Sequence, residues 1–377
     1  MKKIIAISDS FKGTISSIDT CELIRDAFTK QFPECQVVGI PVADGGEGTT
    51  ECFLYALGGQ RVDVTVSGPY FGEKIESFYG RIGNRAIIEM AAAAALPMVE
   101  NRKNPGLTTT YGVGELIRHA VENGCNDIIL GLGGSCTNDG GAGCAAGVGV
   151  VFKNKQGEEF VPTGFTLDEI DSIDISAAQK LLEGCTITIM YDIDNPLWGP
   201  TGAAYIFAPQ KGADPEMVEV LDQKLRAFDQ AIRKSLGIDI STLPGGGAAG
   251  GMGAGMVALL GGKLKAGIET VLDAVDFDSA IADADLIVTG EGKLDTQSLR
   301  GKVVVGIAGR AKKQNKPVIA VVGDVGDGIQ SVYDTGVTAV FSINRVAVPF
   351  SEARLRSKRD YAETMSDIAR FAKVLRK

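Results

Sequence analysis

Short apolar runs alternate with amphipathic stretches at the start of the chain. Residues 3–8 form a β-branched run that is typical of a buried strand, and Leu23, Ile24 and Phe28 are then spaced to share one face of a helix. Residues 36–42 repeat the strand pattern, and a second helix follows them. Strands that alternate with helices favour a parallel sheet that is covered on both faces.

The same alternation returns near the C-terminus. Strands are predicted at residues 285–289, 317–322 and 337–341, a helix is predicted over residues 303–314, and a last amphipathic helix closes the chain. Because both ends show one pattern, we expect them to form a single doubly wound, Rossmann-like α/β domain from residues 1–61 and 281–377.

The middle of the chain follows another pattern. Closely spaced strands are predicted at residues 61–66, 74–82 and 85–90, with turn residues between them, which is an antiparallel habit. Helices, a Gly-rich stretch and further strands come next. We therefore predict that residues 62–280 form a second, inserted α/β domain with a mixed sheet and Gly-rich loops.

Composition and charge exclude several classes of function. Glycine accounts for 49 of the 377 residues, well above its usual share of about 7%, and it clusters in short loops of the kind that bring backbone close to a ligand. Lys and Arg total 38 and Asp and Glu total 47, for a net charge of -9, so the basic footprint of a nucleic-acid-binding protein is missing. An anionic ligand would have to be held by local lysines, arginines and helix N-termini.

Histidine and cysteine exclude further kinds of site. His119 is the only histidine, which removes His-based zinc sites and Ser-His-Asp or Cys-His catalysis within one chain. The 7 cysteines include no C-x-x-C pair and suggest reduced thiols, so we expect a cytoplasmic protein. Residues 245–262 carry no charge but consist largely of Gly and Ala, which favours a buried loop and helix over a membrane span.

Polar loops follow the first two predicted strands. In open α/β sheets, ligands bind at the carboxyl edge of the strands. A lysine beside a glycine suits a phosphate or carboxylate, and neighbouring glycines expose backbone N–H groups to a ligand. An ordinary turn is the alternative for both loops. The candidate residues are Asp9, Ser10 and Lys12 in the first loop and Asp44, Gly45 and Gly46 in the second.

Residues 131–141 carry the clearest signal in the chain. They follow a predicted strand and precede a predicted helix, which is the arrangement of an anion cradle at a helix N-terminus. The loop is too long for a plain tight turn. Its candidate residues are Gly133 and Gly134, which expose backbone, Ser135 and Thr137, which add hydroxyl donors, and Asp139, whose carboxylate can take Mg²⁺ or a proton.

Two later loops have the same placement. Asp192 and Asn195 follow the strand predicted at residues 186–189 and suit a metal ion or the hydroxyl of a sugar acid, although an Asx turn is the competing explanation. The loop after residues 285–289 suggests handling of a triphosphate with Mg²⁺, and its candidates are Glu291, Lys293, Asp295 and Ser298. By contrast, the G-x-G-x-x-G pattern at residues 245–250 follows no strand, so it does not support a dinucleotide site.

Taken in order, these loops resemble the motifs of the bacterial glycerate kinase family. The resemblance covers about residues 1–345, and it is specific because several long motifs occur in one order, whereas no single motif would suffice. The motifs are DSFKG at residues 9–13, ADGGEGT at 43–49, GGSCTNDGG at 133–141, DIDNPL at 192–197, PQKGA at 209–213, GGGAAGGMG at 245–253 and TGEGKLD at 289–295.

The resemblance implies an ATP-dependent kinase that acts on D-glycerate, with 2-phosphoglycerate as the favoured product. It also implies two α/β domains and a Mg²⁺ ion that accompanies the nucleotide. The loops by themselves indicate only anion binding, carboxylate chemistry and a cytoplasmic enzyme, and they do not identify glycerate.

Phosphoryl transfer needs in-line positioning, neutralisation of charge and a group that orients the attacking hydroxyl. We assign Lys12, Lys293 and the loop at residues 133–141 to anion binding. Asp44 and Asp295 are assigned to Mg²⁺, directly or through water, because this ion commonly takes one or two carboxylates.

Asp192 is the first choice for the base that accepts the proton of the substrate hydroxyl, Asp139 is the second, and Lys12 completes the predicted catalytic group. The residues expected to contact substrate or nucleotide are Asp9, Ser10, Gly45, Gly46, Gly133, Gly134, Ser135, Thr137, Asn195, Glu291, Lys293 and Ser298.

Two other functions stay open. A non-catalytic sensor of organic acids would need few acidic residues in its site, whereas these loops collect many. An NAD-dependent hydroxyacid dehydrogenase would need a well placed dinucleotide fingerprint and usually a histidine. The sequence leaves open which hydroxyl is phosphorylated, which enantiomer is preferred, which loop binds adenine and whether the chain forms a homo-oligomer. No nucleic-acid or membrane partner is expected.

Overall fold

The computed structural model describes residues 1–11, 13–43, 45–296, 298 and 302–375. The chain divides into two compact units. The first unit comprises residues 1–43, 55–57 and 268–377, and the second comprises residues 44–54 and 58–267. Both units are α/β, and the second is formed by the middle of the chain, between residues 43 and 268, apart from residues 55–57. The predicted fold class is therefore confirmed.

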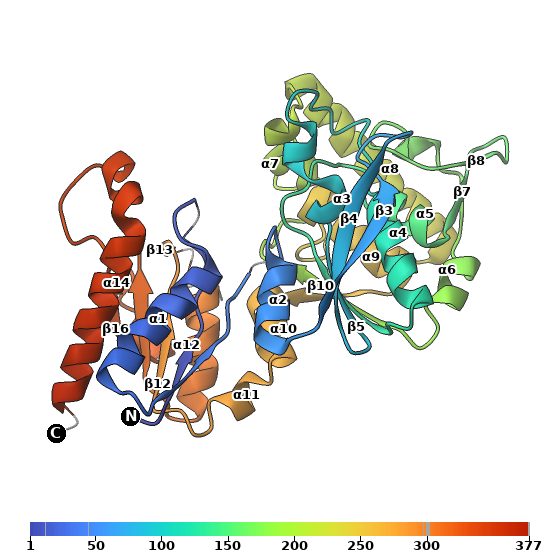
Figure 1. The fold of residues 1–377 in the computed structure, drawn as a ribbon. Helices are drawn as coiled ribbons and strands as arrows, with labels where there is room; N and C mark the ends of the chain where they lie inside the picture. The colour runs from blue at the N-terminus through green and yellow to red at the C-terminus, as the bar shows by residue number, and fades with distance from the viewer. Residues whose placement is uncertain (12, 44, 297, 299–301, 376–377) are drawn as a thin grey trace. The chain divides into compact units, whose positions relative to one another are not determined.

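The first unit is built on a five-stranded sheet in the order β16-β14-β12-β1-β2, in which every pair of neighbours is parallel (Figure 1). Its strands are β1 (Lys3–Ala6), β2 (Gln36–Gly39), β12 (Leu286–Thr289), β14 (Val318–Val322) and β16 (Val337–Ser342). In β1, Ile4 lies opposite Leu286 on one side and Val37 on the other. The apolar runs predicted at the two ends of the chain therefore pair in one sheet, as parallel strands buried on both faces do.

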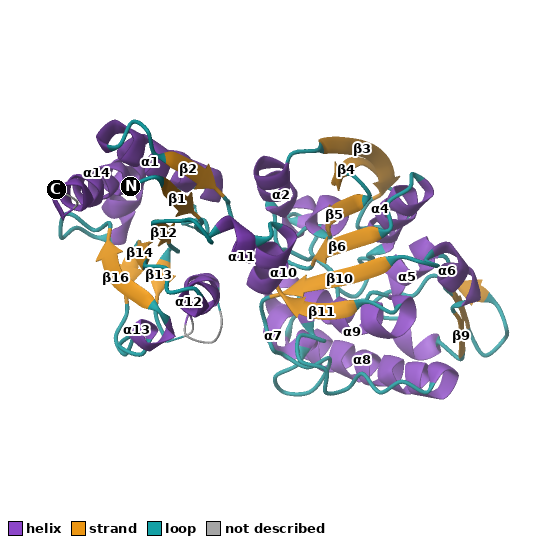
Figure 2. Cartoon of the chain, turned by 90° about the horizontal axis from the view of Figure 1, so that it is seen from below, coloured by secondary structure: helices purple, strands orange, loops and turns teal. Residues whose placement is uncertain are grey.

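Helices cover both faces of this sheet: Figure 2 shows α1 and α14 on one face and α12 and α13 on the other. Ser16 caps the N-terminus of α1, because its side chain accepts a hydrogen bond from the Asp19 N–H at 3.0 Å. The helices are α1 (Ser17–Gln31), α10 (Gly267–Ala274), α11 (Phe277–Ala280), α12 (Val303–Lys313), α13 (Val332–Thr335) and α14 (Phe350–Leu375). Two short strands, β13 (Lys293–Leu294) and β15 (Asp324–Val325), form a separate parallel pair.

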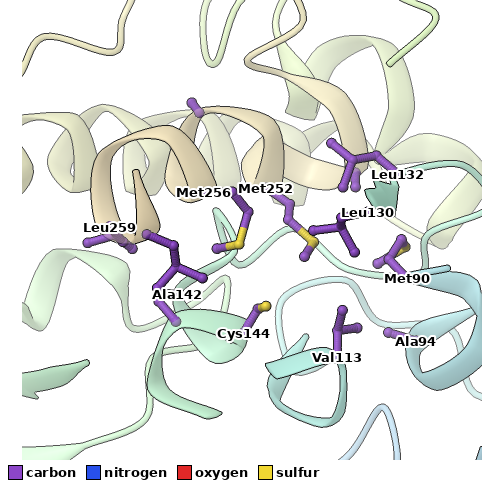
Figure 3. Packing of buried hydrophobic residues seen from close by; sticks show 14 of the residues in the cluster. Met90, Ala94, Val113, Leu130, Leu132, Ala142, Cys144, Met252, Met256 and Leu259 are labelled. Atoms are coloured by element: carbon purple, nitrogen blue, oxygen red, sulfur yellow. The ribbon is translucent and has the colours of Figure 1, made fainter. Parts of the chain in front are cut away.

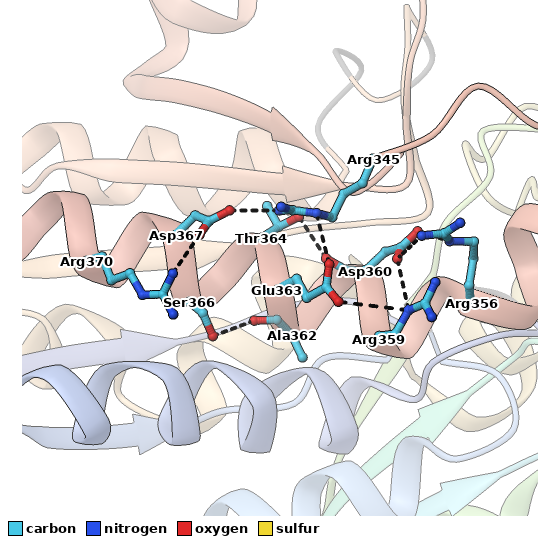
Figure 4. Close-up of polar contacts among 10 residues, drawn as sticks. All are labelled: Arg345, Arg356, Arg359, Asp360, Ala362, Glu363, Thr364, Ser366, Asp367 and Arg370. Atoms are coloured by element: carbon cyan, nitrogen blue, oxygen red, sulfur yellow. Dashed lines mark hydrogen bonds and ion pairs between the residues drawn. The ribbon is translucent and has the colours of Figure 1, made fainter.

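Helix α14 is the amphipathic helix that the pattern predicts at the end of the chain. Tyr361 and Met365 are fully buried in the cluster that also contains residues of α1 and β1. Exposed charged side chains on α14 form ion pairs, such as Arg370 Nη1 with Asp367 at 3.5 Å (Figure 4). The apolar side therefore fixes the helix on the sheet, since exposed ion pairs add about 0–1 kcal/mol each.

The second unit contains a six-stranded sheet in the order β11-β10-β6-β5-β4-β3. The two hairpins β3–β4 and β4–β5 are antiparallel, as predicted, whereas β5, β6, β10 and β11 are parallel neighbours. The strands are β3 (Gln60–Ser67), β4 (Lys74–Ile82), β5 (Arg85–Glu89), β6 (Asp127–Gly131), β10 (Thr186–Tyr191) and β11 (Lys263–Ala266). A three-stranded sheet of β7 (Val151–Lys153), β8 (Glu159–Phe160) and β9 (Ser172–Asp174) lies in the same unit.

The core of the second unit lies between the sheet and its helices. Figure 3 shows Met252 and Met256 of α9 directed toward Leu130, which belongs to β6, and toward Ala142 and Cys144 of α5. The α-helices are α2 (Thr49–Leu57), α3 (Ala91–Ala94), α4 (Tyr111–Glu122), α5 (Ala142–Val148), α6 (Ser176–Leu181), α7 (Ala203–Phe207), α8 (Pro215–Leu236) and α9 (Ala248–Leu260). Three short 3₁₀ helices are η1 (Leu96–Val99), η2 (Leu167–Glu169) and η3 (Pro209–Lys211).

The compact units do not divide the chain where the domain boundaries were predicted. The Gly-rich loop after β2 belongs to the second unit, and nearly all of α10 belongs to the first. Loops that leave one sheet can pack against the other, so strand order alone does not locate such a division. Boundaries at residues 61/62 and 280/281 for independently folding domains therefore stay a prediction.

The uncharged stretch at residues 245–262 forms a loop followed by α9, and its residues are largely buried within the second unit. This agrees with the predicted buried loop and helix. None of the helices in the described part of the chain is both long and apolar enough to cross a membrane.

Candidate active site

Two Gly-rich loops lie against each other at the carboxyl edge of β6. The Gly133 N–H donates to the Gly45 carbonyl at 2.9 Å. A Cβ atom on Gly131 would lie 2.3 Å from the same carbonyl oxygen, and one on Gly133 would lie 2.5 Å from the Gly46 Cα. Gly45 has a φ of +88°. Glycine is therefore required here for close approach, and the structure brings together two loops that lie far apart in the sequence.

Glu89 fixes the N-terminal end of α2 from the end of β5. One carboxylate oxygen accepts the Thr50 N–H at 2.6 Å and the other accepts the Gly48 N–H at 3.3 Å. The side chain is only 2% exposed. Burial raises the pKa of Glu89 from 4.5 to about 7, although its hydrogen bonds with Thr50 and Gly48 oppose the rise.

The free energy of unfolding of Glu89→Gln, relative to that of the wild type, is expected to increase as the pH rises from about 4.5 to about 7. The raised pKa means that the folded wild type binds more protons than the unfolded chain in this window, so the wild type loses stability as the pH increases. Glutamine does not titrate. The upper limit of the relative gain is roughly 3 kcal/mol. The loss of one N–H acceptor adds a cost that does not depend on pH.

The measurement is thermal unfolding of both proteins at several pH values between 4.5 and 8. Glu47→Gln provides a matched control, because Glu47 is an exposed carboxylate on the neighbouring loop. Parallel stability curves for the wild type and Glu89→Gln would show that Glu89 does not titrate in this window.

Asp139 is held inside the second unit. Its Oδ2 accepts the Thr110 N–H at 2.7 Å and the Thr110 hydroxyl at 2.8 Å, and its Oδ1 accepts the Gly141 N–H at 3.1 Å. Burial raises the pKa of Asp139, while the hydrogen bonds from Thr110 and Gly141 lower it. These hydrogen bonds connect the start of α4 to the start of α5, so Asp139 stabilises the packing of the two helices.

Ser135 and Thr137 contact Lys211, a residue to which the sequence analysis assigned no role. Lys211, at the end of η3, donates from Nζ to the Ser135 hydroxyl at 2.6 Å and to the Thr137 carbonyl at 2.7 Å. Burial lowers the pKa of Lys211 from 10.5 to about 8. Gly134 is held as well, since its carbonyl accepts the Leu96 N–H at 2.9 Å. The loop therefore contains a buried cation in addition to its backbone and hydroxyl donors.

Asp192 and Asn195 occupy the loop that leaves β10, next to β6 in the sheet. Asp192 is exposed and immediately follows the strand. The Asn195 side-chain amide donates to the Thr201 carbonyl at 2.7 Å, and the Asn195 carbonyl accepts the Gly247 N–H at 2.9 Å. Asn195 thus holds the loop in shape, and Asp192 is an exposed carboxylate at its start.

In the first unit, the loops after β1 and β12 join in the same manner. The Asp9 N–H donates to the Gly290 carbonyl at 2.9 Å, and the Ser8 hydroxyl donates to the same carbonyl at 3.1 Å. The Ser10 N–H donates to Asp9 Oδ1 at 2.6 Å. Asp9 and Ser10 therefore lie beside the loop that contains Glu291, as their positions after neighbouring strands predict.

The loop after β12 contains a buried acid and an exposed base. Glu291 is 6% exposed, and burial, together with the nearby Asp9 and Asp295 carboxylates, raises its pKa to about 7 while Ser298 lowers it. The Ser298 hydroxyl accepts the Asp295 N–H at 3.2 Å and donates to the Lys293 carbonyl at 3.3 Å. The Lys293 side chain is exposed. The four predicted residues of this loop therefore lie together.

Mg²⁺ would find oxygen ligands in this loop. Glu291 Oε1 is buried and has no hydrogen-bond partner among the described residues, and the Asp295 carboxylate lies near enough to influence Glu291. No cluster of three or more His, Cys, Asp or Glu side chains within the described ranges could hold a metal by itself. Mg²⁺ commonly uses one or two carboxylates and completes its shell with water and phosphate oxygens, so these two residues fit such an ion.

The predicted residues thus fall into two groups, one in each unit. Lys12 and Asp44 lie outside the described residues. Sequence reasoning missed Glu89 and Lys211. The strand predicted at residues 85–90 includes Glu89, so the rule that selected Asp9 and Asp192, which follow their strands, did not find it. The observed strand β5 ends at Glu89. Lys211 follows no strand, and only its place in the motif at residues 209–213 could have drawn attention to it.

The chain is similar to known proteins over nearly its whole length. The profile of the Glycerate kinase family matches residues 4–373. A glycerate kinase of Bacillus cereus is 44% identical over 375 residues, which cover 99% of this chain and 98% of the relative. A glycerate 2-kinase of Escherichia coli is 43% identical over 344 residues, or 90% of each chain. A crystal structure of a Salmonella typhimurium LT2 protein named as a glycerate kinase 2 has a TM-score of 0.88 at 41% identity and covers 100% of this chain and 99% of that one. The chain is therefore an enzyme of the glycerate kinase family.

Proposed function

We propose that this kinase transfers the γ-phosphoryl group of ATP to D-glycerate and forms 2-phosphoglycerate. The observation that carries the proposal is the similarity to the glycerate 2-kinase of Escherichia coli, at 43% identity over 344 residues. The match to the family, over residues 4–373, includes every loop described above at the carboxyl edges of the two sheets. Ligands of open α/β sheets bind at these edges.

Asp192 is the residue that we propose as the base for the attacking hydroxyl. It is exposed directly after β10, where a substrate can reach it. Asp139 stays second, because its oxygens already accept hydrogen bonds from Thr110 and Gly141. A base that only needs to orient the hydroxyl and accept its proton is sufficient for phosphoryl transfer.

The phosphate groups and Mg²⁺ are assigned to the remaining loops. Lys293 would contribute a cationic donor to the phosphate groups, and the loop at residues 133–141 and Lys12 are proposed to bind anionic groups of the nucleotide or of the substrate. Asp295 and Asp44 are the proposed ligands of Mg²⁺, which would neutralise charge on the phosphate oxygens when bound. Asp295 lies beside the buried Glu291 carboxylate, which supports this assignment.

Membership of a kinase family favours this function over the two alternatives, an organic-acid sensor and an NAD-dependent dehydrogenase. A cytoplasmic location, the preference for the D enantiomer and the oligomeric state stay predictions.

Purified protein is expected to release ADP when ATP, Mg²⁺ and D-glycerate are all present. The phosphorylated product should be 2-phosphoglycerate, which ³¹P NMR distinguishes from the 3-phosphate and which enolase consumes directly. Omitting D-glycerate, or replacing ATP with NAD, should abolish product formation.

Two outcomes would contradict the proposal in different ways. A folded protein that releases no ADP with D-glycerate would remove the proposed substrate. Formation of 3-phosphoglycerate alone would keep the substrate and change the hydroxyl that is phosphorylated. A chelator of Mg²⁺ provides the control for the metal, since it should stop the reaction without unfolding the protein.

A further inference from the structure

Lys211 is a buried cation without an ion pair in the described part of the chain. Its side chain is part of a residue that is 2% exposed. The ammonium donates to two neutral oxygens, the Ser135 hydroxyl and the Thr137 carbonyl, at 2.6 and 2.7 Å. An ammonium has three N–H donors, so one donor has no acceptor among the described residues.

A charge in this setting is costly to the folded protein. Burial disfavours an ammonium unless an anion or several acceptors compensate it, and it lowers the pKa of Lys211 to about 8. The carboxylate that influences Lys211 is Asp139, whose oxygens already accept hydrogen bonds from Thr110 and Gly141. The ammonium of Lys211 therefore has no carboxylate partner among the described residues, and an anionic ligand could neutralise its charge.

The loop that Lys211 contacts presents further unsatisfied polar atoms. Within the described residues, the Thr137 hydroxyl and both polar atoms of the Asn138 amide are buried without a hydrogen-bond partner. Asn138 is 0% exposed. Buried polar side-chain atoms are usually bonded. One cation together with a hydroxyl and an amide matches a single carboxylate, which carries one charge and two acceptor oxygens.

The turn that holds Lys211 is rigid. The Lys211 N–H donates to the Ala208 carbonyl at 2.9 Å, and the Gly212 N–H donates to the Pro209 carbonyl at 3.0 Å. Gly212 has a φ of +100°, which favours glycine. The ammonium is therefore positioned before any ligand arrives, as specific recognition requires.

The placement of the loop also suits a small hydroxy acid. Lys211 contacts the loop that leaves β6, and Asp192 leaves β10, whose Met190 pairs with Gly131 at the end of β6. Neighbouring strands lie about 4.8 Å apart. In glycerate, the carboxylate carbon is bonded to the carbon that bears the hydroxyl proposed to attack. The carboxylate can therefore bind beside the loop after β6 while the hydroxyl lies near Asp192, after β10.

We propose that Lys211, with Ser135, Thr137 and Asn138, binds the carboxylate of the substrate and thereby selects a hydroxy acid over an uncharged polyol. This inference rests on the proposed function, because it names the part of D-glycerate that these residues recognise. Lys211 is then a specificity-determining residue of the reaction.

The first test compares two substrates of similar shape, D-glycerate and its uncharged amide, D-glyceramide. Lys211→Met is expected to lower kcat/KM for D-glycerate by about 10- to 100-fold, the range of one lost charge-assisted hydrogen bond. Activity with glyceramide should change by less than about threefold, and the KM for ATP should stay near wild type. Lys224→Met is the matched control, since Lys224 pairs with Asp168 on the surface of the same unit.

Equal losses with both substrates would mean that Lys211 only holds the loop, and this would overturn the inference. A raised KM for ATP with an unchanged KM for D-glycerate would assign the ammonium to a phosphate group, which also overturns it.

The second test measures binding without ATP, by isothermal titration calorimetry with D-glycerate. The wild type should bind at least tenfold more tightly than Lys211→Met, with thermal unfolding showing that both proteins are folded. Equal affinities would overturn this inference and leave the proposed function intact. Wild type that binds D-glycerate but does not phosphorylate it would overturn the proposed function alone, and wild type that does not bind D-glycerate would overturn both.

Discussion

Asp192→Asn is expected to lower kcat by about 10²–10⁴ while the KM for ATP stays near wild type. Asparagine keeps the size of the side chain and one acceptor oxygen, but it cannot accept the proton of the attacking hydroxyl. Asp192 is exposed immediately after β10, and the loop behind it is held by Asn195 through Thr201 and Gly247. The substitution should therefore change the chemistry rather than the fold. Steady-state kinetics at saturating D-glycerate, across a series of Mg²⁺ concentrations, provides the measurement.

The matched control for this experiment is Asp194→Asn. Asp194 is exposed on the same loop and differs from Asp192 in its position relative to the strand. Its replacement should leave kcat within about threefold of wild type. A similar result for Asp192→Asn would remove Asp192 from the mechanism and make Asp139 the next candidate. Partial recovery of the Asp192→Asn rate at high Mg²⁺ would instead identify Asp192 as a ligand of the metal.

The positions of the candidate loops could be predicted from the sequence because they follow from strand order. Apolar runs mark the strands, and a parallel sheet collects the loops after them at one edge. Asp9 and Glu291 come from opposite ends of the chain, yet the loops after β1 and β12 are joined by the hydrogen bond from the Asp9 N–H to Gly290. The contact between Gly45 and Gly133 does not follow from strand order, because Gly45 follows β2 of one sheet and Gly133 follows β6 of the other.

The roles of individual side chains could not be predicted in this way, because they depend on contacts between distant segments. Asp139 is 29 residues from Thr110, which satisfies one of its oxygens. Lys211 reaches Ser135 across 76 residues, and Glu89 reaches Thr50 across 39. A carboxylate and a lysine in a Gly-rich motif look alike in sequence whether they face a ligand or another loop. The burial of the side chain decides between ligand binding and a structural contact. The hydrophobic pattern of an irregular loop carries little information about that burial.

The second large effect is expected where α9 packs against the anion loop. A Cβ atom on Gly255 would lie 1.9 Å from the Gly140 carbonyl oxygen, a separation that real Cβ contacts do not show. The Gly140 N–H also donates to the Gly250 carbonyl at 3.0 Å, so this region of the loop contacts α9 at two points, Gly250 and Gly255. Neither backbone can move without moving the loop that contains Ser135 and Thr137.

Gly255→Ala is therefore expected to lower the free energy of unfolding of the second unit by about 1–3 kcal/mol or more, as overpacking in a core does. It should also lower kcat/KM for D-glycerate by about 100-fold in the protein that remains folded, since a shift of roughly 1 Å in a binding loop has effects of this size.

Gly309→Ala is the control, because Gly309 also lies inside a helix, α12, and a Cβ atom there would meet nothing within 4 Å. Alanine at that position should stabilise the protein by about 0.5–1 kcal/mol through its higher helix propensity, with unchanged activity. Thermal unfolding and kinetics of the two variants would decide, and stability gains in both would show that the loop at residues 133–141 can move away from α9 without loss.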